Sequence, residues 1–155
     1  MKPAYNHVCL TVGDIDRSVA FYKRYFGLKP VRRDPVHAGP RVSDMTGVAG
    51  GELKAVFLSD GDFVLELIQF LGESAASASA CPTNQVGAVH LGFVCDDVRA
   101  AHSAWSAEGV RFVCDPIYSA KRDRWSIMLR DPDGIMIEML EHAALTDEQM
   151  ATARS

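Results

Sequence analysis

The sequence contains an internal repeat, and this feature constrains the possible fold more than any other. His7 heads an apolar stretch and is followed seven residues later by Asp14, while His90 heads a second such stretch and is followed at the same distance by Asp97. Repeated spacing of this kind reflects a repeated supersecondary unit. The chain is therefore predicted to contain two similar modules.

Each copy also contains an apolar strand that carries one carboxylate. Residues 61–68 align position for position with residues 133–140, which places Glu66 on Glu138. Gly134 suits the tight turn before the second strand, because glycine tolerates positive φ. Glu138 lies among such apolar residues that it is expected to be buried. A buried carboxylate costs roughly several kcal/mol unless it has a hydrogen bond, an ion pair or a metal ion as partner.

The order β-α-β-β-β is predicted to occur twice. Asp14 and Asp97 suit the N-caps of the two helices, and Gly27 suits the end of the first. Residues 34–52 are rich in Gly and Pro, lack periodicity and have no equivalent in the second copy, so they are predicted to form a loop. The predicted strands of the first copy are 5–12, 28–33, 53–58 and 63–70, and those of the second are 89–94, 110–113, 126–129 and the strand around Glu138. The predicted helices are 15–26 and 97–108.

Length and composition fit an α+β protein with a substantial core. The chain has 155 residues, of which 48% are hydrophobic, and this is enough to bury a core in one domain built from two modules. A run of small residues that begins at Gly72 suits a linker. The expected organisation is a first βαβββ module at 5–71, a linker at 72–86, a second βαβββ module at 87–142 and a C-terminal tail at 143–155.

Charge and cysteine content exclude several classes of function. The net charge is −4 and no cluster of Lys and Arg offers a track for phosphates, so a nucleic-acid partner is not expected. No apolar run approaches the roughly 20 residues that span a bilayer, and no signal peptide is recognisable. A cytoplasmic protein without a membrane partner is expected. The four cysteines are widely spaced, which favours reduced thiols over disulfides or a zinc knuckle.

The duplicated residues His7, Glu66, His90 and Glu138 predict a metal site. Each of them is expected at the centre of a strand, and strand alternation places it on the face away from the helix. Two imidazole and two carboxylate donors suit one divalent ion such as Zn²⁺, Ni²⁺, Co²⁺, Mn²⁺ or Fe²⁺. A single strand histidine is more often a hydrogen-bonded core residue than a ligand, but a matched pair in both copies favours the metal. The remaining histidines are expected to have surface roles: His37, His102 and His142.

In these motifs the chain resembles the vicinal oxygen chelate superfamily of glyoxalase I, methylmalonyl-CoA epimerase, extradiol dioxygenases and bleomycin- and fosfomycin-resistance proteins. The resemblance covers roughly residues 5–142. It implies tandem βαβββ modules that form a cupped, incompletely closed mixed β-barrel around one metal ion, a small-molecule substrate and a homodimer. The residues that carry it are His7 with 12–22, 65–67, His90, 131–134, Ile137 and Glu138.

The resemblance implies several functions, which the ligand set places in order. A lyase or isomerase like glyoxalase I uses four ligands, with Glu66 or Glu138 as the catalytic base that moves a proton beside a metal-chelated carbonyl through an enediolate. An isomerase like methylmalonyl-CoA epimerase ranks second, because epimerases commonly have Gln at the position where this chain has Glu66. An Fe(II) extradiol-type dioxygenase needs only two His and one carboxylate. A non-catalytic drug-binding resistance protein often lacks the metal residues altogether.

Overall fold

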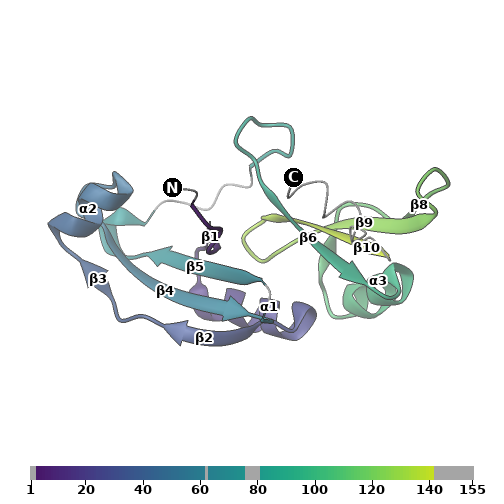
Figure 1. The fold of residues 1–155 in the computed structure, drawn as a ribbon, viewed down its shortest axis with the longest axis horizontal. Coiled ribbons are helices and arrows are strands. Elements are labelled where there is room, and N and C mark those ends of the chain that lie inside the picture. The colour runs from purple at the N-terminus through teal and green to yellow at the C-terminus, as the bar shows by residue number, and fades with distance from the viewer. Residues whose placement is uncertain (1–2, 62, 76–80, 142–155) are drawn as a thin grey trace. The chain divides into compact units, whose positions relative to one another are not determined.

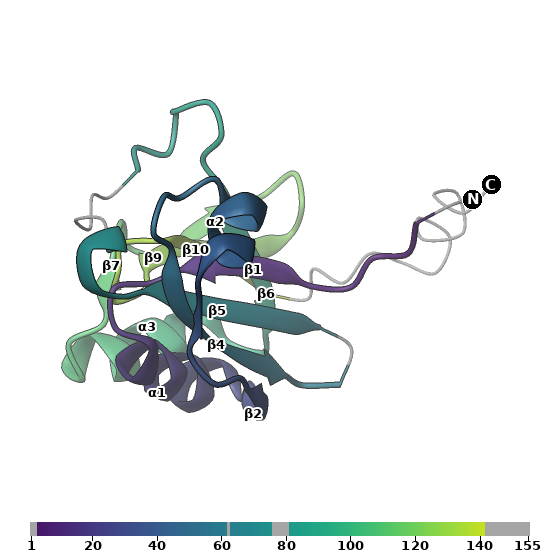
Figure 2. The ribbon, with the colours of Figure 1, turned by 90° about the vertical axis from the view of Figure 1, so that its left-hand side faces the viewer.

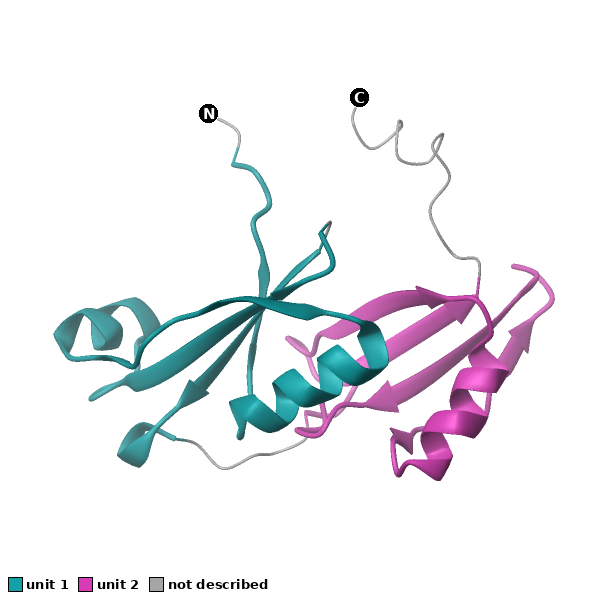
Figure 3. Cartoon of the chain, turned by 90° about the horizontal axis from the view of Figure 1, so that it is seen from below, with its two compact units in different colours: residues 1–80 teal, residues 81–155 magenta. Residues whose placement is uncertain are grey.

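The chain divides into two units, each of which is described by itself. Unit 1 comprises Met1–Ala80 and unit 2 comprises Cys81–Ser155 (Figure 3). The division falls within residues 72–86, the segment predicted as a linker, whereas the predicted tail at 143–155 lies outside the described residues. The computed structural model describes three stretches of the chain: residues 3–61, 63–75 and 81–141.

Unit 1 is a five-stranded mixed sheet with one long helix on one face (Figures 1 and 2). Its elements are β1 (Val8–Thr11), α1 (Ile15–Phe26), β2 (Lys29–Arg33), β3 (His37–Ala38), α2 (Pro40–Thr46), β4 (Glu52–Ser59), β5 (Val64–Phe70) and the 3-10 helix η1 (Gly72–Ser74). The strand order is β1-β5-β4-β2, and β3 pairs with β4. β1 runs parallel to β5, and the other pairs are antiparallel. Helix α1 packs on β5, β4 and β2.

Unit 2 repeats this topology. Its elements are β6 (His90–Cys95), α3 (Val98–Ala107), β7 (Arg111–Phe112), β8 (Ile117–Ser119), β9 (Arg124–Arg130) and β10 (Met136–Glu141). The strand order is β6-β10-β9-β7, β8 pairs with β9, and β6 runs parallel to β10. The predicted α+β fold of two tandem modules is confirmed. Among the described residues of both units, no helix is long and apolar enough to cross a membrane.

Each unit buries one face of its sheet against its helix. The fully buried apolar side chains include Ile15, Tyr22, Leu65 and Leu67 in unit 1, and Val98, Leu129, Ile137 and Met139 in unit 2. Successive strand residues point to opposite faces, so Glu66 and Glu138, each between two buried residues, lie on the face away from the helix. Burial of each large apolar side chain contributes about 1.5–3 kcal/mol. The core therefore fixes the face on which the two carboxylates appear.

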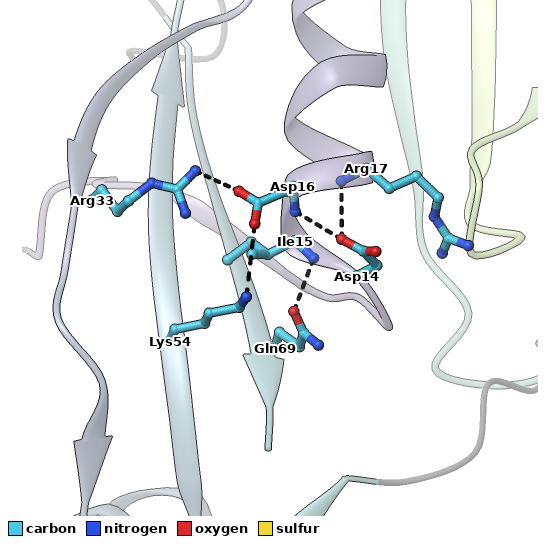
Figure 4. Close-up of polar contacts among 7 residues, drawn as sticks. All are labelled: Asp14, Ile15, Asp16, Arg17, Arg33, Lys54 and Gln69. Atoms are coloured by element: carbon cyan, nitrogen blue, oxygen red, sulfur yellow. Dashed lines mark hydrogen bonds and ion pairs between the residues drawn. The ribbon is translucent and has the colours of Figure 1, made fainter. Parts of the chain in front are cut away.

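Helix α1 is attached to its sheet at the N-terminus (Figure 4). As predicted, Asp14 caps the helix, and its Oδ1 accepts hydrogen bonds from the backbone N–H groups of Asp16 and Arg17 at 3.0 and 3.1 Å. The first helical N–H, that of Ile15, donates to Gln69 Oε1 on β5 at 3.0 Å. A strand side chain thus satisfies a donor that every helix leaves open at this end.

Unit 2 has the same two attachments. Asp97 caps α3 by accepting from two backbone N–H groups of the first turn, and the N–H of Val98 donates to Glu141 Oε1 on β10 at 2.9 Å. Gln69 and Glu141 occupy equivalent places, each three residues after the repeated glutamate. The repeat therefore extends to the contact that fixes each helix against the strand bearing that glutamate.

Residues 34–52 are not a plain loop, so that prediction is wrong. They contain β3 and α2, and α2 begins with Pro40 in its first turn. No residue of α2 is buried, so the segment lacks the apolar periodicity by which a helix is recognised in a sequence. β3 also has an equivalent in unit 2, because β8 pairs with β9 as β3 pairs with β4. Among the described residues of unit 2, α2 has no equivalent.

Candidate metal centre

In unit 1, His7 and Glu66 face each other across a parallel strand pair. His7 immediately precedes β1, and Glu66 is the third residue of β5. The register pairs Cys9 with Glu66, and His7 lies two residues before Cys9, on the same side of the strand. His7 Nε2 lies 3.0 Å from Glu66 Oε2, and the side chains are 33% and 18% exposed. The structure thus brings these two predicted residues together.

In unit 2, His90 and Glu138 are placed by the same construction. His90 is the first residue of β6, Glu138 is the third residue of β10, and the register pairs Gly92 with Glu138. In both units, therefore, the glutamate lies opposite the second residue after the histidine. His90 Nε2 is 3.6 Å from Glu138 Oε2, and these side chains are 50% and 32% exposed. The second pair is wider and more exposed than the first.

Two details differ from the prediction. The histidines do not lie at strand centres, since His7 precedes β1 and His90 begins β6. Glu138 is not buried, because its side chain is 32% exposed. The apolar residues on either side of it, Ile137 and Met139, point to the opposite face and supply the core. An apolar strand inside the sheet of a two-layer unit thus carries a partly exposed carboxylate on its uncovered face, without the cost of full burial.

The distances within both pairs match those between neighbouring ligands of one ion. Metal bonds of about 2.1 Å to nitrogen or oxygen place neighbouring ligand atoms about 3.0 Å apart at right angles and about 3.4 Å apart at tetrahedral angles. The observed Nε2 to Oε2 distances are 3.0 and 3.6 Å. Imidazole nitrogen and carboxylate oxygen are also donors that borderline divalent ions accept. Each pair therefore fits two positions in the coordination sphere of such an ion.

Each unit, taken by itself, brings two candidate ligands together. Within residues 3–61, 63–75 and 81–141, no group of three or more His, Cys, Asp or Glu side chains is arranged to hold a metal ion. Protein metal sites of this donor type use three or four ligands. Each pair by itself therefore has fewer ligands than such a site uses.

The His7 ring has further partners. Its Nδ1 lies 2.6 Å from Asn6 Oδ1, and its edge contacts the Phe57 ring with centroids 5.7 Å apart and planes at 88°. Phe57 lies on β4 directly opposite Glu66. The ring of Phe57 also carries the Arg32 guanidinium over its face, at 3.9 Å from the centroid. Hydrogen bonding and ring packing together hold the imidazole of His7.

Cys9 also lies next to Glu66. Partial burial of its thiol, the nearby Glu66 carboxylate and a hydrogen bond to that carboxylate raise the pKa of Cys9 to about 12, although the residue as a whole remains exposed. The charged thiolate is disfavoured both by lost hydration and by repulsion from the carboxylate. Unit 2 has Gly92 at the equivalent position, so the two pairs differ in this neighbour.

Asn6, Phe57 and Cys9 were not predicted from the sequence. Asn6 could have been recognised from its position next to His7, because a polar neighbour of a candidate histidine ligand can hydrogen-bond the second ring nitrogen of that histidine. Phe57 depends on cross-strand register, which the sequence alone left open. Two of the remaining histidines have carboxylate neighbours at long range, His37 with Asp34 at 3.8 Å and His102 with Asp115 at 3.9 Å. His142 lies outside the described residues.

The chain is similar to known enzymes and structures. It is 24% identical over 139 residues to the mitochondrial methylmalonyl-CoA epimerase of Homo sapiens, covering 86% of this chain and 71% of that protein. It is 28% identical over 135 residues to a probable chloroplastic lactoylglutathione lyase of Arabidopsis thaliana, covering 87% of this chain but only 35% of that protein. The crystal structure of a glyoxalase family protein from Bacillus cereus matches with a TM-score of 0.75 at 21% identity, covering 88% of this chain and 92% of that one.

A family match extends over both units. The family model described as Glyoxalase/Bleomycin resistance protein/Dioxygenase superfamily matches residues 4–139. This range includes both copies of the repeat and all four residues of the two His–Glu pairs. The structural match to the Bacillus cereus protein agrees with the same fold. The chain therefore belongs to the Glyoxalase/Bleomycin resistance protein/Dioxygenase superfamily.

Proposed function

We propose that the chain is a divalent-metal-dependent lyase or isomerase of the glyoxalase I kind, which moves a proton next to a carbonyl group of a small-molecule substrate. The observation that carries this proposal is the occurrence of a His–Glu pair in identical register in both units. Neither pair is part of the core, because the glutamates lie on the face away from the helix and remain partly exposed. Core packing alone gives no reason for the duplication.

The four residues have roles set by their chemistry. His7 and His90 hold the ion through Nε2, and Glu66 and Glu138 complete the ligand set and balance the ionic charge. The bound ion supplies a Lewis acid that polarises the substrate carbonyl and stabilises the charge of an enediolate. One of the two glutamates accepts the proton from the carbon next to that carbonyl and returns it.

The number of ligands favours proton transfer over oxygen chemistry. Iron-dependent dioxygenases of this superfamily type need two histidines and one carboxylate, with open positions for substrate and O₂. A second carboxylate occupies one of those positions. A carboxylate that can leave the ion and act as a base, in contrast, serves proton transfer directly. An intact ligand set also argues against a protein that only sequesters a drug.

An epimerase is the second candidate, supported by the match to methylmalonyl-CoA epimerase over most of that protein. Epimerisation uses the same proton removal beside a carbonyl, followed by return of the proton to the other face. The two candidates therefore share one site and differ in substrate. An assay with methylmalonyl-CoA and with the hemithioacetal isomer of lactoylglutathione separates them.

Metal binding is the first test of the proposal. The metal-free protein is titrated with Zn²⁺, Ni²⁺, Co²⁺, Mn²⁺ and Fe²⁺, and one ion per chain is expected. His7→Ala and His90→Ala are each expected to lose tight binding, whereas the control His37→Ala keeps it. If a mixture of His7→Ala and His90→Ala proteins recovers tight ion binding, two copies of the chain complete the site together, as in a homodimer. Wild-type protein that takes up none of these ions would overturn the proposal.

The second test follows the proton. Turnover in D₂O is expected to place deuterium on the carbon next to the substrate carbonyl. Glu66→Gln and Glu138→Gln proteins that retain the ion are compared, and the variant that lacks the base is expected to lose exchange while it still binds substrate. Consumption of O₂ in step with turnover of the Fe²⁺ protein would instead support the dioxygenase.

A further inference from the structure

The two histidines of the proposed site differ in what holds their rings. His7 has a neighbour at each ring nitrogen, because Nδ1 lies 2.6 Å from Asn6 Oδ1 and Nε2 lies 3.0 Å from Glu66 Oε2. Asn6 Oδ1 accepts from the ring when Nδ1 carries the proton, and Glu66 Oε2 accepts when Nε2 carries it. The contact with Asn6 is the shorter of the two and favours the proton on Nδ1. This tautomer leaves a lone pair on Nε2 for an ion, 3.0 Å from the carboxylate oxygen.

His90 lacks both supports. The residue before it is Val89, which is 62% exposed and has no side-chain acceptor. Within the described part of unit 2, no residue gives His90 a hydrogen bond equivalent to that of Asn6. The residue opposite Glu138 on β9 is the flexible Met128, where unit 1 has Phe57 opposite Glu66. The longer 3.6 Å separation and higher exposure of the unit 2 pair agree with weaker restraint.

We infer that Asn6 is a positioning residue that fixes His7 in the Nδ1–H tautomer and makes the His7–Glu66 pair the preorganised half of the metal site. The His90–Glu138 pair is the adaptable half, which adjusts to the ion once His7 and Glu66 hold it. This inference rests on the proposed metal site and assigns a role within it to a residue outside the ligand set. Outer partners that hold a ligating histidine in one tautomer typically contribute 10- to 100-fold to metal affinity.

The test uses the full chain and two readouts. The Kd for Zn²⁺ is measured by competition with a chromophoric chelator, and the tautomer of His7 is read from imidazole chemical shifts of the metal-free protein in mildly alkaline buffer. Asn6→Ala is expected to weaken Zn²⁺ binding about 10- to 100-fold and to shift His7 away from the Nδ1–H tautomer. Asn6→Asp, which keeps an acceptor oxygen, is expected to restore both. Val89→Ala changes the matching position before His90 and is expected to alter neither.

The outcomes separate this inference from the proposed function. Wild-type protein that binds Zn²⁺ while Asn6→Ala binds it equally well overturns the inference alone, and so does a metal-free wild-type protein with the proton of His7 on Nε2. Wild-type protein that binds no divalent ion overturns the proposed function and, with it, the role given to Asn6. Asn6 is exposed, and an unchanged unfolding midpoint of Asn6→Ala confirms that the fold is intact.

Discussion

Cys9 is expected to be a slow nucleophile, because the pKa of its thiol is raised from 9.0 to about 12. Near pH 8 a thiol of pKa 9.0 is about 10% ionised, whereas one of pKa 12 is ionised to about one part in ten thousand. The ionised fraction thus falls about a thousandfold. The more basic thiolate is intrinsically more reactive, by about 15- to 30-fold for three pKa units. The net expectation is alkylation about 30 to 60 times slower than that of an ordinary cysteine.

The assay is alkylation by iodoacetamide, with the extent at each cysteine followed by peptide mass spectrometry and a small free thiol as the reference. Glu66→Gln removes the carboxylate charge, so the pKa of Cys9 is expected to fall and its alkylation to accelerate. The raised pKa also implies that folding stability is complete below pH 9 and declines between pH 9 and about 12, because the unfolded thiol ionises first. Alkylation of Cys9 at the reference rate in wild-type protein would refute the contact with Glu66. An alkylation rate that Glu66→Gln leaves unchanged would refute it as well.

Three further predictions concern stability. Glu141→Ala removes the acceptor for the first N–H of α3 and is expected to lower the free energy of unfolding by about 1–3 kcal/mol. Glu141→Gln is expected to cost less, because Gln69 fills the same role in unit 1. Urea titration measures both losses, and equal losses would contradict the assignment. Gly134→Ala is expected to cost about 1–2 kcal/mol because the residue has φ 90, and an unchanged thermal midpoint would show that the turn adopts another conformation. A divalent ion at 100 times its Kd is expected to raise the free energy of unfolding of wild-type protein by about 2.7 kcal/mol, and a chelator is expected to remove this gain. His7→Ala is expected to show neither the gain nor the effect of the chelator.

Local chemistry made much of the fold predictable. Asp14 and Asp97 were recognised as helix caps, and Gly27 as a helix end, because each acts on its immediate neighbours. The repeat aligned the two modules and selected the two His–Glu pairs for comparison. Strand alternation then predicted the face on which Glu66 and Glu138 lie.

The features that were missed depend on partners distant in sequence or on the absence of burial. Helix α2 buries no residue, so it has no apolar stripe to detect. The short strand β8 is recognisable by its pairing with β9, because its own three residues show no clear strand pattern. Glu138 was expected to be buried because its neighbours are apolar, but burial on one face of a strand says nothing about the other face. The contact of Phe57 with His7 required the register between β4 and β5.

The parallel pairing of the first and fourth main strands in each unit links chemistry to folding. Shifting β5 by one residue against β1 would turn Glu66 toward α1 and expose Leu65 and Leu67, which are fully buried. The loss of two leucines from the core, roughly 3–6 kcal/mol, therefore opposes any register that misdirects the carboxylate. A one-residue insertion in the hairpin between β4 and β5 has to be absorbed by the turn, because the strand is held in place from both sides. The connecting segments can therefore change in sequence and length while Glu66 stays on the same face of the sheet. Selection for a stable core also preserves the geometry of the His7–Glu66 pair.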